Sequence, residues 1–216
     1  MAVGSIASFT QESFEHLPKI RIFKYPEVLC SSLEVHPPPD IIGFSNYVWN
    51  FQLSYRFAEF IHRSFPETLI IFGGPNYPVD QNEQEHFLRQ YPAIDLYIVK
   101  EGEIAFSNVV REFLVHNGEI SLIKSLCLPS VHKISNDDRF QYSVEIERLK
   151  NLDEIPSPYL SGVLDEFFDG KLMPLVQTNR GCPFSCTFCV EGVKYYNKIS
   201  VNSESKLSKE FHYIGA

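Results

Sequence analysis

Hydrophobic residues in the first half of the chain fall into two kinds of pattern that alternate along the sequence. Short continuous apolar runs predict strands covered on both faces, as in a parallel sheet. Between them, apolar residues spaced three or four positions apart predict amphipathic helices. The predicted strands are residues 20–23, 40–45, 68–72 and 95–99, and the predicted helices are residues 4–17, 25–33, 49–65, 81–90 and 103–116.

This alternation predicts an open α/β fold with helices on both faces of the sheet. In such sheets ligands bind beyond the carboxyl ends of the strands, where three loops are expected in this chain. The candidate ligand-binding residues of these loops are Ser45, Asn46, Tyr47, Gly73, Gly74, Pro75, Glu101, Gly102 and Glu103.

Several residues at these strand ends also have a purely structural interpretation. Ser45 could cap the following helix, and Trp49 could anchor packing instead of lining a ligand. Glu101 and Glu103 could form a solvated helix start, which the helix dipole favours. The Gly73-Gly74 pair points more strongly to function, because adjacent glycines cost stability unless close backbone approach requires them.

The pattern changes after residue 117. Residues 131–134 and 140–144 are predicted to pair as a hairpin, and a segment with two prolines then predicts a linker. A short helix, a strand and a final helix are expected at residues 161–168, 171–178 and 203–214. The expected domains are residues 1–117, 118–160 and 161–216.

Composition narrows the class of protein. The formal net charge of −8 disfavours a nucleic-acid partner, because phosphate binding requires a basic surface. No apolar run is long enough to span a bilayer, and the N-terminus lacks the features of a signal peptide, so a cytoplasmic protein is expected. The 5 cysteines are odd in number and three are clustered, which favours metal binding over a disulfide framework.

The clustered cysteines, Cys182, Cys186 and Cys189, have the spacing C-x3-C-x2-C in a loop that is predicted to follow a strand. Three thiolates could ligate a 4Fe–4S cluster and leave one iron open to a further ligand. The aromatic side chains of Phe184 and Phe188 could shield such a cluster from water.

Two alternatives to an iron–sulfur cluster stay open at these cysteines. The first is zinc, but zinc in a closed structural site takes four ligands, and the further candidates, Cys127 and His212, lie far from the loop in sequence. The second is a redox-active or incidental group of cysteines. Cys30 and Cys127 are isolated and are expected to be inert.

The cysteine spacing, with Phe188 before the last cysteine, resembles the CxxxCxxC signature of radical S-adenosylmethionine (SAM) enzymes. Residues 178–183 resemble the subgroup that carries an N-terminal cobalamin-binding domain. Residues 42–50, 72–75 and 101–103 resemble the three cofactor-facing loops of that domain, and residues 155–160 resemble its linker. The implied fold class is a flavodoxin- or Rossmann-like parallel-sheet domain of the cobalamin-binding type, followed by the start of a radical SAM partial TIM barrel.

The resemblance implies three cofactors: a 4Fe–4S cluster on the three cysteines, SAM and cobalamin, with Phe188 as a further cofactor-binding residue. The open iron would chelate SAM, and an electron from the reduced cluster would cleave it to a 5′-deoxyadenosyl radical. An external electron donor is therefore implied. Methyl transfer from cobalamin, or another carbon-centred radical reaction on an unknown substrate, is the implied activity.

Several elements of this family have no match in the chain. No strand precedes the first predicted helix, although the first strand of a flavodoxin-like sheet is central, so a gap in the sheet is expected. No D-x-H-x-x-G sequence supplies a histidine ligand to cobalt, and His16 is expected on the surface. Only one β/α unit of the barrel is present. The chain is thus expected to be a fragment of a longer radical SAM enzyme.

Two alternatives stay open for the chain itself. It could be a catalytically inactive fragment that only binds a cluster or cobalamin, so its own status as an enzyme is undecided. A methylthiotransferase-like radical SAM protein is the other alternative. That class would require a second upstream set of cluster-binding cysteines, which the sequence lacks.

Overall fold

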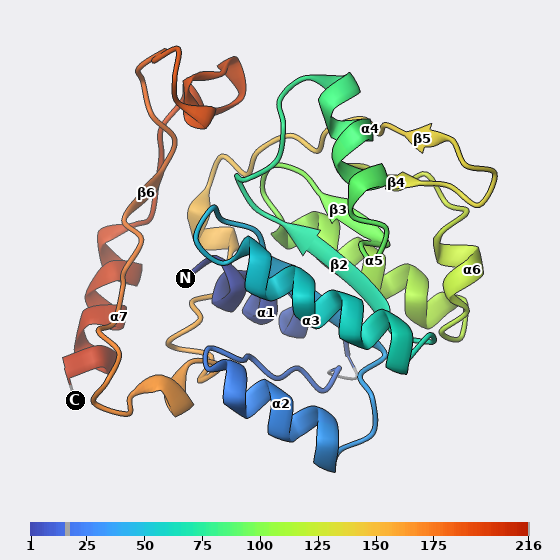
Figure 1. The fold of residues 1–216 in the computed structure, drawn as a ribbon. Helices are drawn as coiled ribbons and strands as arrows, with labels where there is room; N and C mark the ends of the chain where they lie inside the picture. The colour runs from blue at the N-terminus through green and yellow to red at the C-terminus, as the bar shows by residue number, and fades with distance from the viewer. Residues whose placement is uncertain (16–17, 216) are drawn as a thin grey trace. The chain divides into compact units, whose positions relative to one another are not determined.

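The computed structural model describes residues 1–15 and 18–215 (Figure 1). His16 and Leu17, the last residue of the first predicted helix, lie outside the described residues, and the helix itself ends earlier than predicted, at Glu12. The chain divides into two compact units, Phe23–Ile146 (the sheet unit) and Met1–Ile22 with Glu147–Ala216 (the loop unit). The N-terminal segment therefore belongs to the same compact unit as the C-terminal part of the chain. The expected domains, residues 1–117, 118–160 and 161–216, stay a prediction.

The sheet unit is built on a five-stranded sheet in the order β1-β2-β3-β4-β5. β1, β2 and β3 are parallel, as the continuous apolar runs predict, whereas β4 is antiparallel to both β3 and β5. The predicted hairpin is confirmed, but it joins the parallel strands in one mixed sheet. The strands are β1 (Ile41–Ser45), β2 (Leu69–Gly73), β3 (Leu96–Ile98), β4 (Val131–Ile134) and β5 (Phe140–Gln141).

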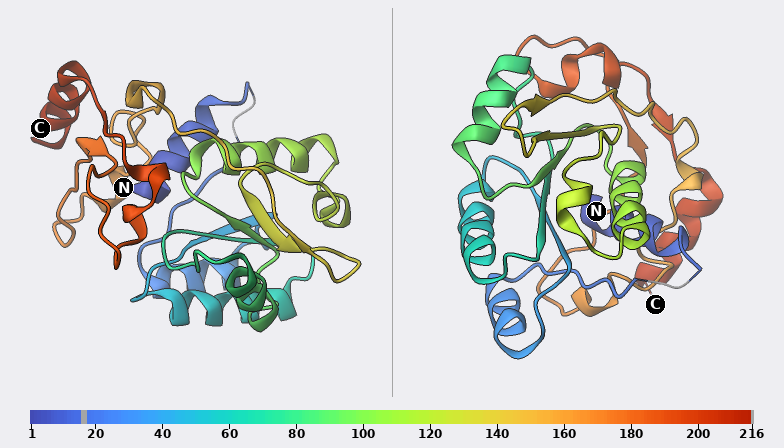
Figure 2. Two further views of the ribbon diagram at one scale, coloured as in Figure 1. Left: turned by 90° about the horizontal axis from the view of Figure 1, so that it is seen from above. Right: turned by 90° about the vertical axis from the view of Figure 1, so that its right-hand side faces the viewer.

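Helices cover both faces of this sheet (Figure 2). On one face α3 and α4 pack against Phe72 and Tyr97, and on the other α5 and α6 pack against Ile71 and Leu96. Two cores on opposite faces explain why the central strands are apolar at every position. The helices of this unit are α2 (Pro26–Val35), α3 (Phe51–Ser64), α4 (Gln81–Gln90), α5 (Glu103–Val115) and α6 (Ile120–Ile123).

Local sequence signals set the ends of these helices. Pro26 occupies the first turn of α2, where its missing N–H would have no intrahelical partner. The Asp80 carboxylate caps α4 by accepting the N–H groups of Asn82 at 2.9 Å and Glu83 at 3.2 Å. α3 ends at Ser64, shortly before Pro66, whose ring disfavours a helical residue before it.

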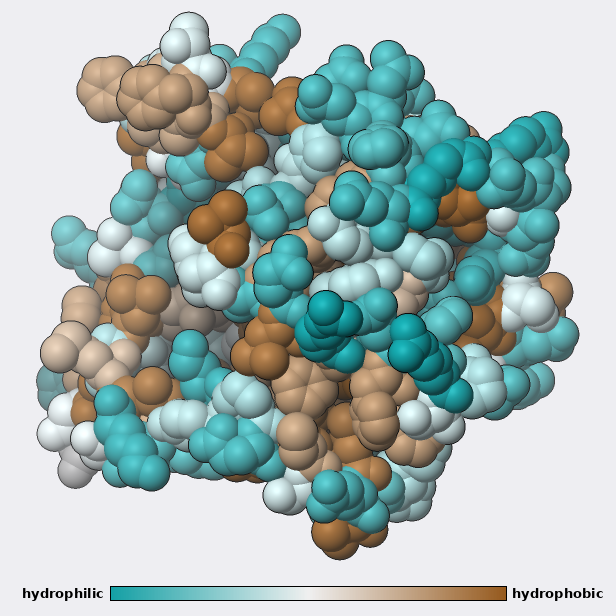
Figure 3. Space-filling view, in the orientation of Figure 1, coloured by the Kyte–Doolittle hydropathy of each residue, from teal (hydrophilic) through white to brown (hydrophobic). Residues whose placement is uncertain are grey.

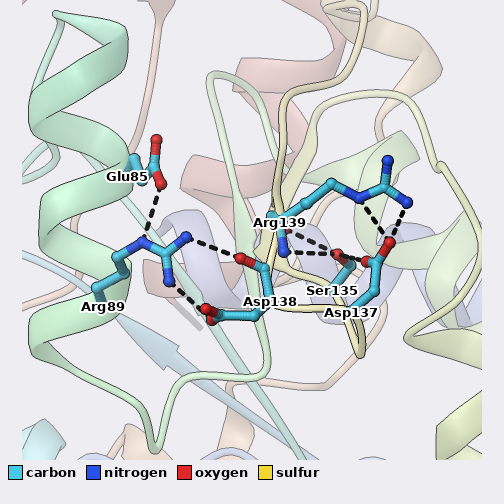
Figure 4. Close-up of polar contacts among 6 residues, drawn as sticks. All are labelled: Glu85, Arg89, Ser135, Asp137, Asp138 and Arg139. Carbon is cyan, nitrogen blue, oxygen red and sulfur yellow. Dashed lines mark hydrogen bonds and ion pairs between the residues drawn. The ribbon is translucent and has the colours of Figure 1, made fainter.

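Arg89 ties the turn of the β4–β5 hairpin to α4 (Figure 4). Its Nη1 lies 2.7 Å from Asp138 Oδ1, its Nη2 donates to the Asp138 carbonyl at 2.8 Å, and its Nε donates to Glu85 Oε1 at 2.9 Å. Within the turn, Arg139 pairs with Asp137. These groups lie in solvent, so the pairs orient the hairpin and contribute little to stability.

The expected gap inside the sheet does not occur between the described strands, which are contiguous with β1 at one edge. The strand predicted at residues 20–23 is wrong, because this segment is irregular. The reason is the lack of a partner: a strand of this length is stable only in a ladder with an adjacent strand.

Two predictions in the loop unit are also wrong. Residues 161–168 contain only the 3-10 turn Asp165–Phe167, and residues 171–178 form no strand. The Tyr159 hydroxyl accepts the Leu175 N–H at 2.9 Å and donates to the Leu175 carbonyl at 3.0 Å. A side chain therefore satisfies the backbone groups that a neighbouring strand would otherwise pair.

The loop unit consists of two helices, a short ribbon and irregular segments. α1 buries a face of small residues: a Cβ on Gly4 would lie 3.0 Å from Pro158 Cβ, and Ser8 Oγ donates to the Pro156 carbonyl at 2.8 Å. Its elements are α1 (Ala2–Glu12), β6 (Asn179–Arg180), β7 (Ser200–Val201) and α7 (Glu204–Gly215). In the described part of the chain, no helix has both the length and the apolar character that a bilayer crossing requires.

Candidate functional site

The parallel strands bring the three predicted loops to one edge of the sheet unit. Ser45 pairs with Gly73, and Gly73 pairs with Ile98, so β1, β2 and β3 end side by side. The segments that follow these strands therefore start from the same edge (Figure 1). The sequence prediction of adjacent loops is confirmed, whereas ligand contact at these loops stays a prediction.

Asn46 joins the loops that follow β1 and β2. Its side chain is fully buried, with Nδ2 donating to the Asn76 carbonyl at 2.7 Å and to Tyr97 Oη at 2.9 Å. Its Oδ1 accepts from Asn76 Nδ2 at 3.0 Å, and its backbone N–H donates to the Gly73 carbonyl at 2.7 Å. The Asn46 side chain therefore holds the loops together, and it has no surface with which to contact a ligand while the loops stay closed.

Gly74 makes this close approach possible. Its φ is +134°, and a Cβ at this position would lie 2.5 Å from the Asn46 carbonyl oxygen. Its own carbonyl accepts the Tyr97 hydroxyl at 2.9 Å. Gly73 is less crowded, with its Cβ position 3.3 Å from the Ile98 carbonyl oxygen. The two glycines thus allow close contact with the backbone, as predicted. The contacts observed are with the backbone of Asn46 and Ile98, in other segments of the chain.

The exposed side chains at this edge come mainly from the loop after β1. The Tyr47 ring stacks on Trp49 with centroids 4.7 Å apart, and Trp49 is 79% exposed. Trp49 is therefore not a packing anchor. Ser45 does not cap α3, because Asn50 is the N-cap residue and no side chain caps this helix; the Ser45 hydroxyl instead accepts Asn50 Nδ2 at 3.1 Å. Pro75, in the loop after β2, is also exposed.

The third loop differs from the expectation of a solvated helix start. Glu103 lies in the first turn of α5 but is only 4% exposed, and Glu101 and Gly102 are half-buried. Lys100 has a left-handed φ of 66°, and its Nζ lies 3.5 Å from Glu145 Oε1. The acidic residues of this loop are thus packed into the unit instead of lying in solvent.

Sequence reasoning missed three residues beneath these loops. Tyr77 stacks on Tyr97 with centroids 3.8 Å apart, and its Oη lies 3.4 Å from Nδ1 of His132, which is 2% exposed. Burial raises the pKa of both tyrosine hydroxyls. His132 lies in a strand and Tyr77 in a loop, and neither belongs to a motif, so only the fold reveals this cluster.

His132 is held neutral by its surroundings. Burial, and secondarily the charge of Lys100, lowers the pKa of its imidazole to about 4 from the ordinary value of 6.5. Its Nε2 is buried and has no hydrogen-bond partner among the residues that the structure describes. Protonating this ring would place an uncompensated charge among aromatic side chains.

We expect this histidine to give the sheet unit an acid-sensitive component of stability. Because its folded pKa lies below its unfolded value, the unfolded chain binds more protons between pH 6.5 and about 4. The free energy of unfolding should therefore fall by roughly 3 kcal/mol as the pH drops through this window. Urea denaturation at a series of pH values measures this fall.

His132→Gln should flatten that part of the pH profile. His86→Gln is the matched control, because it removes an exposed histidine of α4. An unchanged pH dependence in His132→Gln would refute the assignment.

The cysteine loop of the loop unit is closed at its base, which we call the neck: residues 179–182 running beside residues 196–201. Arg180 pairs with Ser200 in the β6–β7 ribbon, and the Cys182 N–H donates to the Tyr196 carbonyl at 2.9 Å. Gly181 has a φ of +97°, and a Cβ there would lie 2.2 Å from the Lys198 carbonyl oxygen. The first cysteine is thus held by backbone contacts that tolerate only glycine before it.

The other two cysteines lie on the outer part of this loop. The Cys189 N–H donates to the Cys186 carbonyl at 3.1 Å. Gly192 folds against this turn, where a Cβ would lie 2.2 Å from the Cys186 carbonyl oxygen. Phe184 and Phe188 are 68% and 92% exposed, and hydrophobic side chains gather at this end of the loop unit (Figure 3, upper left). The predicted shielding of a cluster by these rings stays a prediction.

The three cysteines of this loop carry accessible thiols. None forms a disulfide, Cys186 and Cys189 are exposed, and Cys182 is partly exposed. Across residues 1–15 and 18–215, no three Cys, His, Asp or Glu side chains converge on a position for one metal ion. A 4Fe–4S cluster binds each cysteine through a different iron, so its thiolates need not converge on one point. Among the described residues the structure thus shows no preassembled site for a single ion, and an iron–sulfur cluster at this loop stays a prediction.

The chain is thus an α/β protein in which three loops follow the parallel strands at one edge of the sheet and a loop in the other unit carries three free cysteines. The chain is homologous to cobalamin-dependent radical SAM methyltransferases. It is 28% identical over 182 residues to TokK of Streptomyces tokunonensis, a cobalamin-dependent radical SAM methyltransferase, with 82% of this chain and 25% of TokK covered. It is 30% identical over 182 residues to the 2-(S-pantetheinyl)-carbapenam-3-carboxylate methyltransferase of Streptantibioticus cattleyicolor, with 82% and 25% covered.

The fold is shared with a solved structure of the same kind. The cobalamin-dependent SAM radical enzyme OxsB, solved with aqua-cobalamin and SAM bound, matches with a TM-score of 0.69 and 19% identity over 99% of this chain and 28% of OxsB. No protein-family model matches. The chain spans about a quarter of the length of the curated relatives. The α/β fold is thus confirmed, and the start of a radical SAM barrel at residues 161–216 stays a prediction.

Proposed function

We propose that this chain holds a 4Fe–4S cluster on Cys182, Cys186 and Cys189 and presents cobalamin at the edge of its sheet, as part of a radical SAM enzyme that transfers methyl groups. The observation that carries the proposal is the pre-closed loop with three free thiols in a homologue of cobalamin-dependent radical SAM methyltransferases. When bound, the cluster would supply the electron that cleaves SAM, and cobalamin would supply the methyl group.

The residues of the chain have distinct parts in this proposal. The three thiolates bind the cluster, and the neck fixes Cys182 relative to the rest of the loop. At the sheet edge, the Tyr47–Trp49 stack offers an apolar face to a corrin ring. The loop after β2 stays in place through Asn46, so exposed atoms of Pro75 and its neighbours meet the ligand at a constant position.

Anaerobic reconstitution of the chain with iron and sulfide tests the cluster part. We expect iron and sulfide in near-equal amounts, four of each per chain, with the visible absorption and reduced-state paramagnetic signal of a 4Fe–4S centre. Cys30→Ser/Cys127→Ser is the matched control and should reconstitute equally, because these two thiols belong to the other compact unit and lie far from the loop in sequence. A chain that takes up no cluster under these conditions contradicts the proposal.

A narrower function is the alternative: the chain binds the cluster or cobalamin but does not turn over SAM. The observation in its favour is the open surface around the cysteine loop, where Phe188 is 92% exposed. An assay for 5′-deoxyadenosine from SAM, with a chemical reductant in place of the electron donor, separates the two. Its formation by the reconstituted chain excludes the alternative, and its absence with an intact cluster supports it.

A further inference from the structure

Arg148 lies outside every motif of the sequence and contacts the neck of the cysteine loop. Its Nη1 donates to the Lys198 carbonyl at 2.7 Å and, at a longer 3.4 Å, to the Tyr195 carbonyl. Its guanidinium carbon lies 5.8 Å from the centroid of the Tyr195 ring and 5.7 Å from that of Tyr196. One side chain thus gathers backbone carbonyls and aromatic rings from the segment that follows the cysteines.

The same segment holds the first cysteine. The Tyr196 carbonyl accepts the Cys182 N–H at 2.9 Å. The Lys198 carbonyl oxygen lies only 2.2 Å from the position that a Cβ on Gly181 would occupy. Arg148 Nη1 itself lies 3.1 Å from that Cβ position. Both sides of the neck therefore meet at the guanidinium, although Arg148 precedes Cys182 by more than thirty residues in the sequence.

We propose that Arg148 is a positioning residue for the cysteine loop: it clamps the neck so that Cys182 is held in place before a cluster binds. This inference rests on the proposed cluster function. A planar guanidinium can donate to a carbonyl while lying against two rings, which an ammonium on a flexible stem cannot reproduce. Preorganising the loop in this way lowers the entropy lost when the thiolates meet the cluster.

The first test needs no cluster. In the unloaded chain, alkylation of the three thiols by iodoacetamide, followed by mass spectrometry, reports how well each is protected. We expect Cys182, which is less exposed than Cys186 and Cys189, to react more slowly than they do. In Arg148→Met the ratio of Cys182 to Cys189 modification should rise toward unity, and Arg148→Lys should lie between that variant and the unchanged chain.

The second test uses the reconstituted chain under a chelator challenge. The visible absorption of the cluster should decay about tenfold faster in Arg148→Met, the scale typical for residues that orient metal ligands. Arg139→Met is the matched control, because it removes an exposed arginine of the sheet unit. The melting temperature of Arg148→Met, measured by circular dichroism, must equal that of the unchanged chain. If it is lower, the alkylation and chelator experiments are read from Arg148→Lys instead.

The outcomes separate the two proposals. Equal alkylation ratios in the unchanged chain and both Arg148 variants overturn the positioning role, whether or not a cluster binds. A changed ratio in a chain that takes up no cluster supports the clamp and contradicts the cluster function. A changed ratio together with faster cluster loss supports both.

Discussion

Replacing any one of Cys182, Cys186 or Cys189 with alanine is expected to lower the cluster content of the reconstituted chain at least about tenfold. Two thiolates leave two irons of the cluster without protein ligands. Iron and sulfide analysis, with the paramagnetic signal after reduction, measures the loss.

The fold should not respond to these substitutions, and that separates a ligand from a structural residue. Cys186 and Cys189 are exposed and form no disulfide, so their side chains make little contribution to packing. Thermal melting of each variant should match that of the unchanged chain. A single variant that retains the full cluster would show that the ligand set is different from the one proposed.

Gly74→Ala is expected to lower the free energy of unfolding of the sheet unit by about 3 kcal/mol. The added methyl group would lie 2.5 Å from the Asn46 carbonyl oxygen and 2.9 Å from the Asn46 nitrogen, at a φ of +134° that side chains rarely adopt. The loops after β1 and β2 would have to separate, which would break the hydrogen bonds between Asn46 and Asn76. Urea denaturation followed by circular dichroism and by the fluorescence of the single tryptophan, Trp49, measures the change.

Gly170→Ala is the matched control for this prediction. Gly170 also has a positive φ, +74°, but no atom lies within 4 Å of the added methyl group. It should therefore cost only the backbone preference, about 1 kcal/mol. Equal losses in the two variants would mean that the crowding between the loops does not matter. The reconstituted Gly74→Ala chain should still load its cluster, because Gly74 and the cysteines lie in different compact units.

Local pattern predicted most of the sheet unit well. Its three parallel strands, its hairpin and its longer helices have clear hydrophobic patterns. The fold buries each of these elements as its pattern predicts. The prediction of a strand at residues 171–178 was wrong for a reason that the local sequence pattern does not reveal. The hydroxyl of Tyr159 pairs with the backbone of Leu175, and a contact of this kind depends on where a distant side chain lies.

The candidate sites likewise combine residues that the sequence identifies with residues that only the structure reveals. Sequence identified the cysteine loop and the glycine pair, because chemistry and backbone freedom are properties of residue types. It did not identify Asn46 as a buried link, Tyr97 as its partner, or His132 beneath them. Nor did it indicate that Arg148 contacts the neck. The contacts of Asn46 and Arg148 join residues that lie 30 to 51 positions apart in the sequence.

The sequence by itself determined the class of fold, the three thiols of the cysteine loop and the resemblance to radical SAM proteins. Only the tertiary structure decided which residues hold the loops. Hydrophobic period and ligand spacing are local properties that a short stretch of chain carries alone. A buried hydrogen bond or a clamp on a neck exists only when two distant segments meet, and packing and loop closure decide whether they do.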